Sequence, residues 1–270
     1  MEKKLIRIFY PLMLLIVATC FSACSTTPKA TKDKTIEIVV HRGANHLAPE
    51  NTIPSAMAAL ENGADWVEVD VRRSQDSILY NLHDENLERT TNGKGSILET
   101  SSEIINTLDA GSWFGPQFKG TPVPTIAEML DALKGKAKVF FDVKRGTPID
   151  KLVTLVRLKG FEKESFFWFA EPKMLEEFIC IAPEMKVKVN ASNIEKLQEW
   201  MKVCQPAYVE VETKNITPQF REFCKNNHIL IMAAIQNASE EDYKMAIEAQ
   251  PDLVNLDQPE LFIKVLNEMN

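Results

Sequence analysis

Carboxylates alternate with valines in residues 66–73, which read WVEVDVRR. Successive side chains of a β-strand point to opposite faces, so Glu68 and Asp70 share one face and the valines share the other. Two carboxylates a few ångströms apart are costly to bury unless a positive charge neutralises them. Converging oxygen ligands of this kind suit Ca²⁺ or Mg²⁺. Taken alone, the segment fits a half-exposed strand with a charged outer face equally well.

Other apolar runs also end in residues that can do chemistry. The first is followed by His41 and Arg42, and the run VFFDVK carries Asp142 and Lys144 two positions apart. A shorter run ends in YNLHD, which contains His83. Only four histidines occur in the chain, so two of them at strand ends beside Arg or Asp are unlikely to be there by chance. Acids for a cation, imidazoles for proton transfer and permanent positive charges for an anion together predict a catalytic site.

These side chains require elements that bring several strand ends to one place. Apolar runs rich in β-branched or aromatic residues recur eight times, and segments of helical period separate most of them. The runs are residues 36–40, 66–71, 138–143, 165–169, 186–189, 207–211, 229–234 and 252–256. Thr125 with Glu128 forms a capping box, Pro54 suits a first helical turn, and Ser239 suits an N-cap. Repeated strand–helix alternation predicts an α/β fold, a parallel (β/α)₈ TIM barrel.

One connection is much longer than an ordinary loop between a strand and a helix. An insertion of about residues 74–124 follows the second strand. We expect SILYNLHD to form a short extra strand that pairs with the second one, and LETSSEIINTLDAG to form a short helix. Insertions at the carboxyl end of a barrel strand commonly carry substrate-facing residues.

The N-terminal segment has the features of an export signal. Lys3, Lys4 and Arg7 precede an apolar stretch, and small residues lead directly to Cys24. Residues 1–23 resemble a bacterial lipoprotein signal peptide, with Cys24 as the lipidated residue; an ordinary cleaved signal is the alternative. A Ser-, Thr-, Pro- and Lys-rich tether follows at residues 24–35, and the folded domain is expected at 36–270. We therefore expect an exported lipoprotein anchored in a membrane by its lipid, facing the periplasm or the cell surface.

Composition limits the partners of this domain. The chain has 270 residues, a formal net charge of −7 and no cluster of basic residues. An acidic balance argues against nucleic acid as a partner. The sequence leaves the oligomeric state open.

Several blocks of the sequence resemble the glycerophosphodiester phosphodiesterase family in order and spacing. They are HRGANHLAPENT, EVDV, LHDENLERTTNGKG, LDAGSWF and VPTIAEML, followed more weakly by LVNLDQPELF. The resemblance implies a TIM barrel that uses a divalent cation to hydrolyse small glycerophosphodiesters to glycerol 3-phosphate and an alcohol.

Residue roles also follow from the resemblance. Glu68, Asp70 and Asp142 correspond to metal ligands for Ca²⁺ or Mg²⁺. We expect Arg42 and Lys144 to bind the phosphate, and His41 and His83 to be the acid–base pair, with His41 as base and His83 as acid or the reverse. The nucleophile is water or the glycerol 2-hydroxyl. We expect Glu50 and Asn51 to orient His41 or Arg42. Trp113 and Phe114 either wall the pocket or pack within the insertion.

The sequence departs from the family at two places. Asp142 occupies a position where the family usually has Glu, and a side chain shorter by one methylene withdraws the ligand by about 1.5 Å. The late segment Met232–Gln236 lacks the aromatic residue that the family commonly has there. The second departure favours one alternative, the same chemistry on a lysophospholipid, a phosphoinositide or an envelope polymer. A surface lipoprotein that kept the barrel only for binding is a separate alternative, and the intact His41 and His83 argue against it.

Overall fold

The computed structural model describes residues 36–269 of the chain. The expected signal peptide of residues 1–23, the lipidation residue Cys24 and the tether of residues 24–35 lie outside the described residues. Within 36–269, no helix is both long enough and apolar enough to cross a membrane. The fold described below is that of the expected barrel domain.

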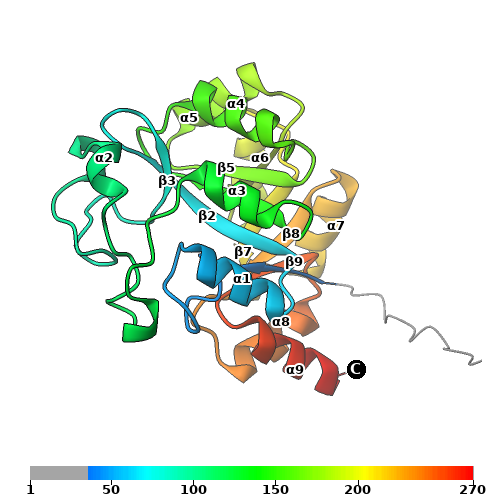
Figure 1. Cartoon of the computed structure of the whole chain (residues 1–270). Helices are drawn as coiled ribbons and strands as arrows, with labels where there is room; N and C mark the ends of the chain where they lie inside the picture. The colour runs from blue at the N-terminus through cyan, green and yellow to red at the C-terminus, as the bar shows by residue number, and fades with distance from the viewer. Residues whose placement is uncertain (1–35, 270) are drawn as a thin grey trace, which may run out of the picture. The chain divides into compact units, whose positions relative to one another are not determined.

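Eight parallel strands close into a barrel, which confirms the predicted (β/α)₈ architecture (Figure 1). Closure arises because β1 pairs with both β2 and β9, the first neighbour and the last strand of the chain. Every strand agrees with its predicted run to within two residues at either end. The barrel strands are β1 (Glu37–Val40), β2 (Trp66–Arg73), β4 (Lys138–Val143), β5 (Ser165–Phe169), β6 (Lys186–Asn190), β7 (Tyr208–Glu212), β8 (Leu230–Ala234) and β9 (Leu253–Leu256).

Helices surround the barrel strands (Figure 1), and three of them start at the predicted signals. Thr125 and Glu128 form the expected capping box, and Ser239 caps its helix together with Asp242. Pro54 lies in a first turn. The helices are α1 (Ile53–Glu61), α3 (Ile126–Leu133), α4 (Ile149–Lys159), α5 (Pro172–Ile181), α6 (Ile194–Met201), α7 (Pro218–Asn226), α8 (Glu240–Ala249) and α9 (Pro259–Met269), with a 3₁₀ turn η3 (Thr213–Asn215) before α7.

Alternation along the strands divides the core into two parts. The valines of β2, Val67, Val69 and Val71, are buried in the large core that also contains helix side chains. Their inward neighbour Trp66 belongs to a second cluster, which fills the barrel interior. That cluster is Val39, Trp66, Phe140, Phe166, Tyr208, Met232 and Leu253. Because this apolar layer fills the interior, the inward positions nearer the carboxyl ends of the strands are free to be polar.

The insertion after β2 is a structured unit with a small core of its own. Its extra strand β3 (Leu79–Asn81) pairs antiparallel with β2, as predicted. The predicted helix is shorter than the sequence pattern: its residues form the 3₁₀ turn η1 (Ile97–Glu99) and the four-residue helix α2 (Ser102–Ile105), and a second 3₁₀ turn, η2 (Pro116–Phe118), follows. The insertion core is Tyr80, Leu82, Leu87, Ile97, Ile105, Ala110 and Val123. This core fixes the strand from which His83 emerges.

Candidate active site

Three carboxylates converge at the carboxyl ends of β2 and β4. Glu68 and Asp70 project from β2, and Asp142 lies opposite Asp70 in the strand register. One oxygen from each of the three lies within 4.8 Å of the others. Glu68 and Asp70 are buried, and Asp142 is partly buried. The half-exposed strand that the isolated segment allowed is therefore wrong, because β2 is buried on both faces here.

The three acids fit a divalent cation. The Oδ1 atom of Asp142 is buried and accepts no hydrogen bond from any described residue, so a carboxylate oxygen is left for a ligand. Burial, together with the neighbouring carboxylates Asp70, Asp142 and Glu210, raises the pKa of Glu68 to about 7. Such a cluster of acids is unfavourable by itself and favourable around a positive ion.

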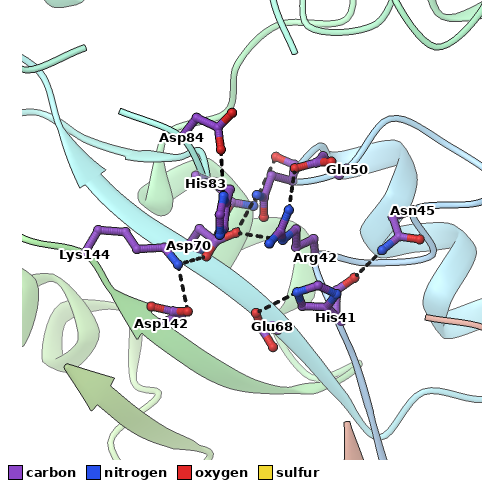
Figure 2. Close-up of polar contacts among 12 residues, drawn as sticks. His41, Arg42, Asn45, Glu50, Glu68, Asp70, His83, Asp84, Asp142 and Lys144 are labelled. Atoms are coloured by element: carbon purple, nitrogen blue, oxygen red, sulfur yellow. Dashed lines mark hydrogen bonds and ion pairs between the residues drawn. The ribbon is translucent and has the colours of Figure 1, made fainter. Parts of the chain in front are cut away.

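Two permanent cations lie against the same acids (Figure 2). The Nζ atom of Lys144 is 2.7 Å from Asp70 Oδ1 and 2.8 Å from Asp142 Oδ2. The Nε atom of Arg42 is 3.6 Å from Asp70 Oδ2. Although burial favours the neutral acid, Lys144 and then His83 and Arg42 hold the pKa of Asp70 below its usual value. Asp70 is therefore an anion in this site.

His41 is held on the other side of the acids by the last strand of the barrel. Its Nδ1 atom is 2.9 Å from Asp257 Oδ1, and its Nε2 atom is 3.8 Å from Glu68 Oε1. Asn45 and the backbone N–H of Asn237 donate to the two oxygens of Asp257. Burial alone would lower the pKa of His41, but Glu68 and the bond to Asp257 raise it. The ring is thus oriented with Nε2 toward the acids.

His83 follows β3 and lies beside Asp70 in Figure 2. Its Nδ1 atom is 2.7 Å from Asp84 Oδ1, so its Nε2 atom is left for substrate. The backbone carbonyl of His83 accepts a bond from Arg72 Nε at 2.7 Å. Both histidines therefore have one ring nitrogen held by a carboxylate, the arrangement expected of proton-transfer groups.

Arg89 joins the partners of His83 and Arg42. It donates to both oxygens of Asp84, at 2.5 and 3.1 Å, and to both oxygens of Glu50, at 2.8 Å each. Glu50 in turn accepts from Arg42 at 3.1 Å. Glu50 thus contacts Arg42 as the sequence predicted.

Asn51, the second residue expected near His41 or Arg42, contacts Arg42 through the backbone: its N–H donates to the carbonyl of Arg42 at 2.9 Å. It donates through Nδ2 to Asp70 Oδ2 at 2.7 Å. Its backbone carbonyl accepts a bond from Asn81 of β3. Asn51 therefore lies against Arg42, as expected, and its side chain also holds Asp70 Oδ2, the oxygen that Arg42 Nε approaches.

A cavity of about 680 Å³ opens beside the acids. His41, Glu68 and Asp142 line it, together with residues of β4 to β9, Lys196 of α6 and residues of the segments that follow β6, β7 and β8. His83 is not part of this lining, and neither are Trp113 and Phe114. The two aromatic residues contact each other at 5.7 Å between ring centroids, and Trp113 donates to a carbonyl of the insertion. They pack on each other within the insertion and do not line this cavity.

Four further polar residues point into the barrel near the acids. Asn255 donates to Glu68 at 2.9 Å and to Glu210 at 3.3 Å, and Lys188 forms an ion pair with Glu210. Asp257 holds His41. The sequence reasoning did not single out these residues, although the segments KVKVN, VEVE and VNLD alternate apolar and polar residues as WVEVDV does.

The chain is similar to known proteins over most of its length. The model of the glycerophosphoryl diester phosphodiesterase family matches residues 41–164. A glycerophosphodiester phosphodiesterase of Caldanaerobacter subterraneus is 30% identical over 239 residues, which are 86% of this chain and 98% of that protein. A glycerophosphodiester phosphodiesterase of Bacillus subtilis is 38% identical over 140 residues, which are 49% of this chain and 47% of that protein.

Solved structures of similar proteins have the same fold. The crystal structure of a glycerophosphodiester phosphodiesterase from Agrobacterium tumefaciens aligns with a TM-score of 0.79 at 34% identity, covering 85% of this chain and 99% of that one. An Oleispira antarctica phosphodiesterase in complex with the product sn-glycerol-3-phosphate aligns with a TM-score of 0.77 at 25% identity, covering 86% of this chain and 96% of that one.

Proposed function

This chain belongs to the glycerophosphodiester phosphodiesterase family and is a phosphoric diester hydrolase, and we propose how the polar rim of its barrel performs the hydrolysis. The substrate is a small glycerophosphodiester, and the products are glycerol 3-phosphate and an alcohol. The observation that carries this proposal is the convergence of Glu68, Asp70 and Asp142, with one oxygen of each within 4.8 Å of the others.

The first requirement is to offset the negative charge of the phosphodiester. Glu68, Asp70 and Asp142 would hold Ca²⁺ or Mg²⁺, which when bound polarises the phosphate and stabilises developing charge. Lys144 and Arg42 lie against Asp70 and are placed to pair with the remaining phosphate oxygens.

The second requirement is the movement of two protons. His41, oriented by Asp257, takes the proton of the attacking hydroxyl, from water or from the glycerol 2-hydroxyl. Attack by water gives glycerol 3-phosphate directly, whereas attack by the 2-hydroxyl gives a cyclic phosphate that water then opens to glycerol 3-phosphate. His83, oriented by Asp84, gives a proton to the leaving alkoxide. The two imidazoles come from different segments, β1 and the insertion, so each can serve one side of the phosphorus.

The purified protein tests this proposal through the release of glycerol 3-phosphate. We expect chelation to abolish turnover and Mg²⁺ or Ca²⁺ to restore it. His41→Ala and His83→Ala should each lower kcat by about 10²- to 10⁴-fold. The matched control is His228→Asn, because His228 is exposed and its side chain forms no hydrogen bond or ion pair with another described residue. Turnover that survives chelation, or an unaffected histidine variant, would contradict the proposal.

The assignment of acid and base has its own test. A glycerophosphodiester of 4-nitrophenol has a leaving group that needs little protonation. The variant that lacks the general acid should regain activity on this substrate, while the variant that lacks the base should not. We expect rescue of His83→Ala; rescue of His41→Ala instead would exchange the two roles.

We also propose that the enzyme is an exported lipoprotein. The support is the charged start, the apolar stretch and the small residues before Cys24 in the sequence. Labelling cells with a fatty-acid analogue should modify the wild-type chain and not Cys24→Ala, which should leave the membrane fraction. Equal membrane association of both proteins would refute the anchor.

A further inference from the structure

The cavity beside the acids is larger than the reacting groups require. Its volume is about 680 Å³, whereas a water molecule occupies about 30 Å³ in the liquid. A phosphate with glycerol displaces only a few waters, so both substituents of the diester fit inside. The leaving oxygen would stay at the acids beside His83, which does not line the cavity, and the rest of the alcohol would extend along the cavity walls. The chemistry of these walls therefore bears on which alcohol is accepted.

One wall of this cavity is made of uncharged polar side chains. Asn190 ends β6, Ser192 follows it, Asn215 ends η3 and Gln236 follows β8. Among residues 36–269, none of these four side chains forms a hydrogen bond with another residue. The amides Asn190 and Gln236 lie on opposite sides of β7, because one ends β6 and the other follows β8. Donors and acceptors therefore face the cavity from more than one strand. Together they provide hydrogen-bonding groups that the protein itself does not use.

The aromatic residues of the cavity are already engaged by a cation of the protein. Phe140 and Trp168 are the aromatic residues that line it. The Nζ atom of Lys188 lies 4.8 Å from the ring centroid of Phe140 and 5.5 Å from that of Trp168. A quaternary ammonium needs free aromatic faces, and here it would meet the positive charge of Lys188 instead.

The carboxylates of the cavity beyond the three acids are also paired. Glu210 forms an ion pair with Lys188, and Glu212 forms one with Lys214 at 2.5 Å. A cationic alcohol would have to break one of these pairs to gain a partner. The cavity thus offers unused hydrogen bonds and little unpaired negative charge.

From these contacts we infer that the leaving alcohol is a polyhydroxylated alcohol, such as glycerol or a cyclitol, in preference to a quaternary-ammonium alcohol. This inference rests on the proposed function and names the substrate class of the same site. Hydroxyl groups would pair with Asn190 and Gln236, whereas a trimethylammonium group neither donates nor accepts a hydrogen bond. A site built to hydrogen-bond a hydroxyl discriminates strongly against a substrate that lacks it.

The test compares four diesters on one enzyme preparation with the cation restored. They are glycerophosphoinositol, glycerophosphoglycerol, glycerophosphocholine and glycerophosphoethanolamine. We expect kcat/KM to be about tenfold higher for the first two than for glycerophosphocholine. Equal or higher kcat/KM for glycerophosphocholine would overturn the inference while leaving the proposed function intact. Absence of turnover on all four would instead overturn the proposed function.

Variants of the polar wall provide the second readout. Asn190→Leu and Gln236→Leu should each lower the ratio of kcat/KM between glycerophosphoinositol and glycerophosphocholine by about threefold or more. The matched control is Gln198→Leu, because Gln198 is exposed on α6 but does not line the cavity. It should leave the ratio unchanged. Wall variants that keep the wild-type ratio would show that these amides do not contact the alcohol.

Discussion

Arg89 connects two parts of the site that the sequence places far apart. One guanidinium holds Asp84, the partner of His83, and also Glu50, the partner of Arg42. Burial favours a neutral Glu50, but the bonds from Arg89 and Arg42 keep the pKa of Glu50 below its usual value. The bidentate geometry fits arginine and not lysine. We therefore expect Arg89 to position both His83, the proposed acid, and Arg42, the proposed phosphate-binding group.

We expect Arg89→Met to lower kcat by about 10- to 100-fold with a much smaller effect on KM. The side chain of Arg89 is 44% exposed, and exposed ion pairs contribute little to stability, so the melting temperature should change little. The pH profile of kcat should also shift, because the carboxylate behind His83 loses its partner. Steady-state kinetics at several pH values measure kcat, KM and the pH profile, and thermal unfolding measures the melting temperature.

The control for this prediction is Arg157→Met. Arg157 also bridges a carbonyl and a carboxylate on the surface, but in α4 and away from the acids. It should leave kcat and the pH profile unchanged. If Arg89→Met lost stability and activity in proportion, a positioning role would be wrong.

Some residues of the site can be recognised in the sequence, and others only in the folded structure. Glu68, Asp70 and Asp142 are visible because acids in an apolar strand are unusual. The bond between His41 and Asp257 joins residues 216 positions apart, and no local pattern pairs them. Closure of the barrel by β1 and β9 creates that contact, so it appears only in three dimensions.

The register of β2 determines which side chains reach the cation site. Its outward valines are buried, and full burial of such a side chain stabilises a fold by roughly 1.5–3 kcal/mol. A shift by one residue would turn these valines inward and place Glu68 and Asp70 among the apolar helix residues. Packing of the valines thus selects the register that the site needs.

The turn after β1 positions His41 and Arg42 by an unusual backbone. Arg42 has φ of 59° and Gly43 has φ of 76°, both in the left-handed region. A Cβ atom at Gly43 would lie 2.7 Å from the carbonyl carbon of Ser55 and 2.8 Å from its oxygen. The turn therefore packs directly on the first turn of α1, and glycine is required at this position.

We expect Gly43→Ala to lower the free energy of unfolding by about 2 kcal/mol or more, and to lower kcat as well, because Arg42 moves with the turn. Gly135→Ala is the matched control: Gly135 has φ of 69°, but a Cβ atom there has no neighbour within 4 Å. It should cost about 1 kcal/mol and leave kcat unchanged. Urea unfolding measures the loss of unfolding free energy, and turnover measures the loss of kcat. Equal losses in Gly43→Ala and Gly135→Ala would argue against the close contact of position 43 with Ser55.

Elements with strong local signals could be predicted, and the insertion only in part. Thr125 with Glu128 marks a helix start, and β-branched runs mark the barrel strands. The short elements of the insertion are held by its own small core and by hydrogen bonds between distant residues. In one of these bonds, Tyr80 Oη donates to Asn106 Oδ1 at 2.7 Å. Those contacts do not follow from periodicity, which explains why the predicted helix was too long.

At the scale of the whole molecule, the buried acids couple stability to pH and to the cation. Without a cation the folded-state pKa of Glu68 is about 7, above its ordinary value of 4.5. The fold thus favours the neutral acid. The stabilisation that the fold gains from a neutral Glu68 is fully present below pH 4.5, and it is lost as the pH rises through about 7.

We therefore expect the chelated protein to lose on the order of 3 kcal/mol of unfolding free energy from Glu68 as the pH rises through that range. Saturating Ca²⁺ or Mg²⁺ should remove the decline, because the ion favours the ionised acid. Urea unfolding at several pH values, with and without the cation, measures this. Glu68→Gln, which cannot ionise, is the control and should show a smaller decline. A decline of equal size in Glu68→Gln would assign it to other groups.

The closure of the barrel has a consequence for the timing of synthesis. His41 is made early, whereas Asp257, which orients it, belongs to the segment after the last strand. A polypeptide that stops before β9 has His41 without Asp257, and it has β1 without the strand that pairs with it at that edge. We therefore expect hydrolytic competence to arise only after the segment that contains Asp257 has been made.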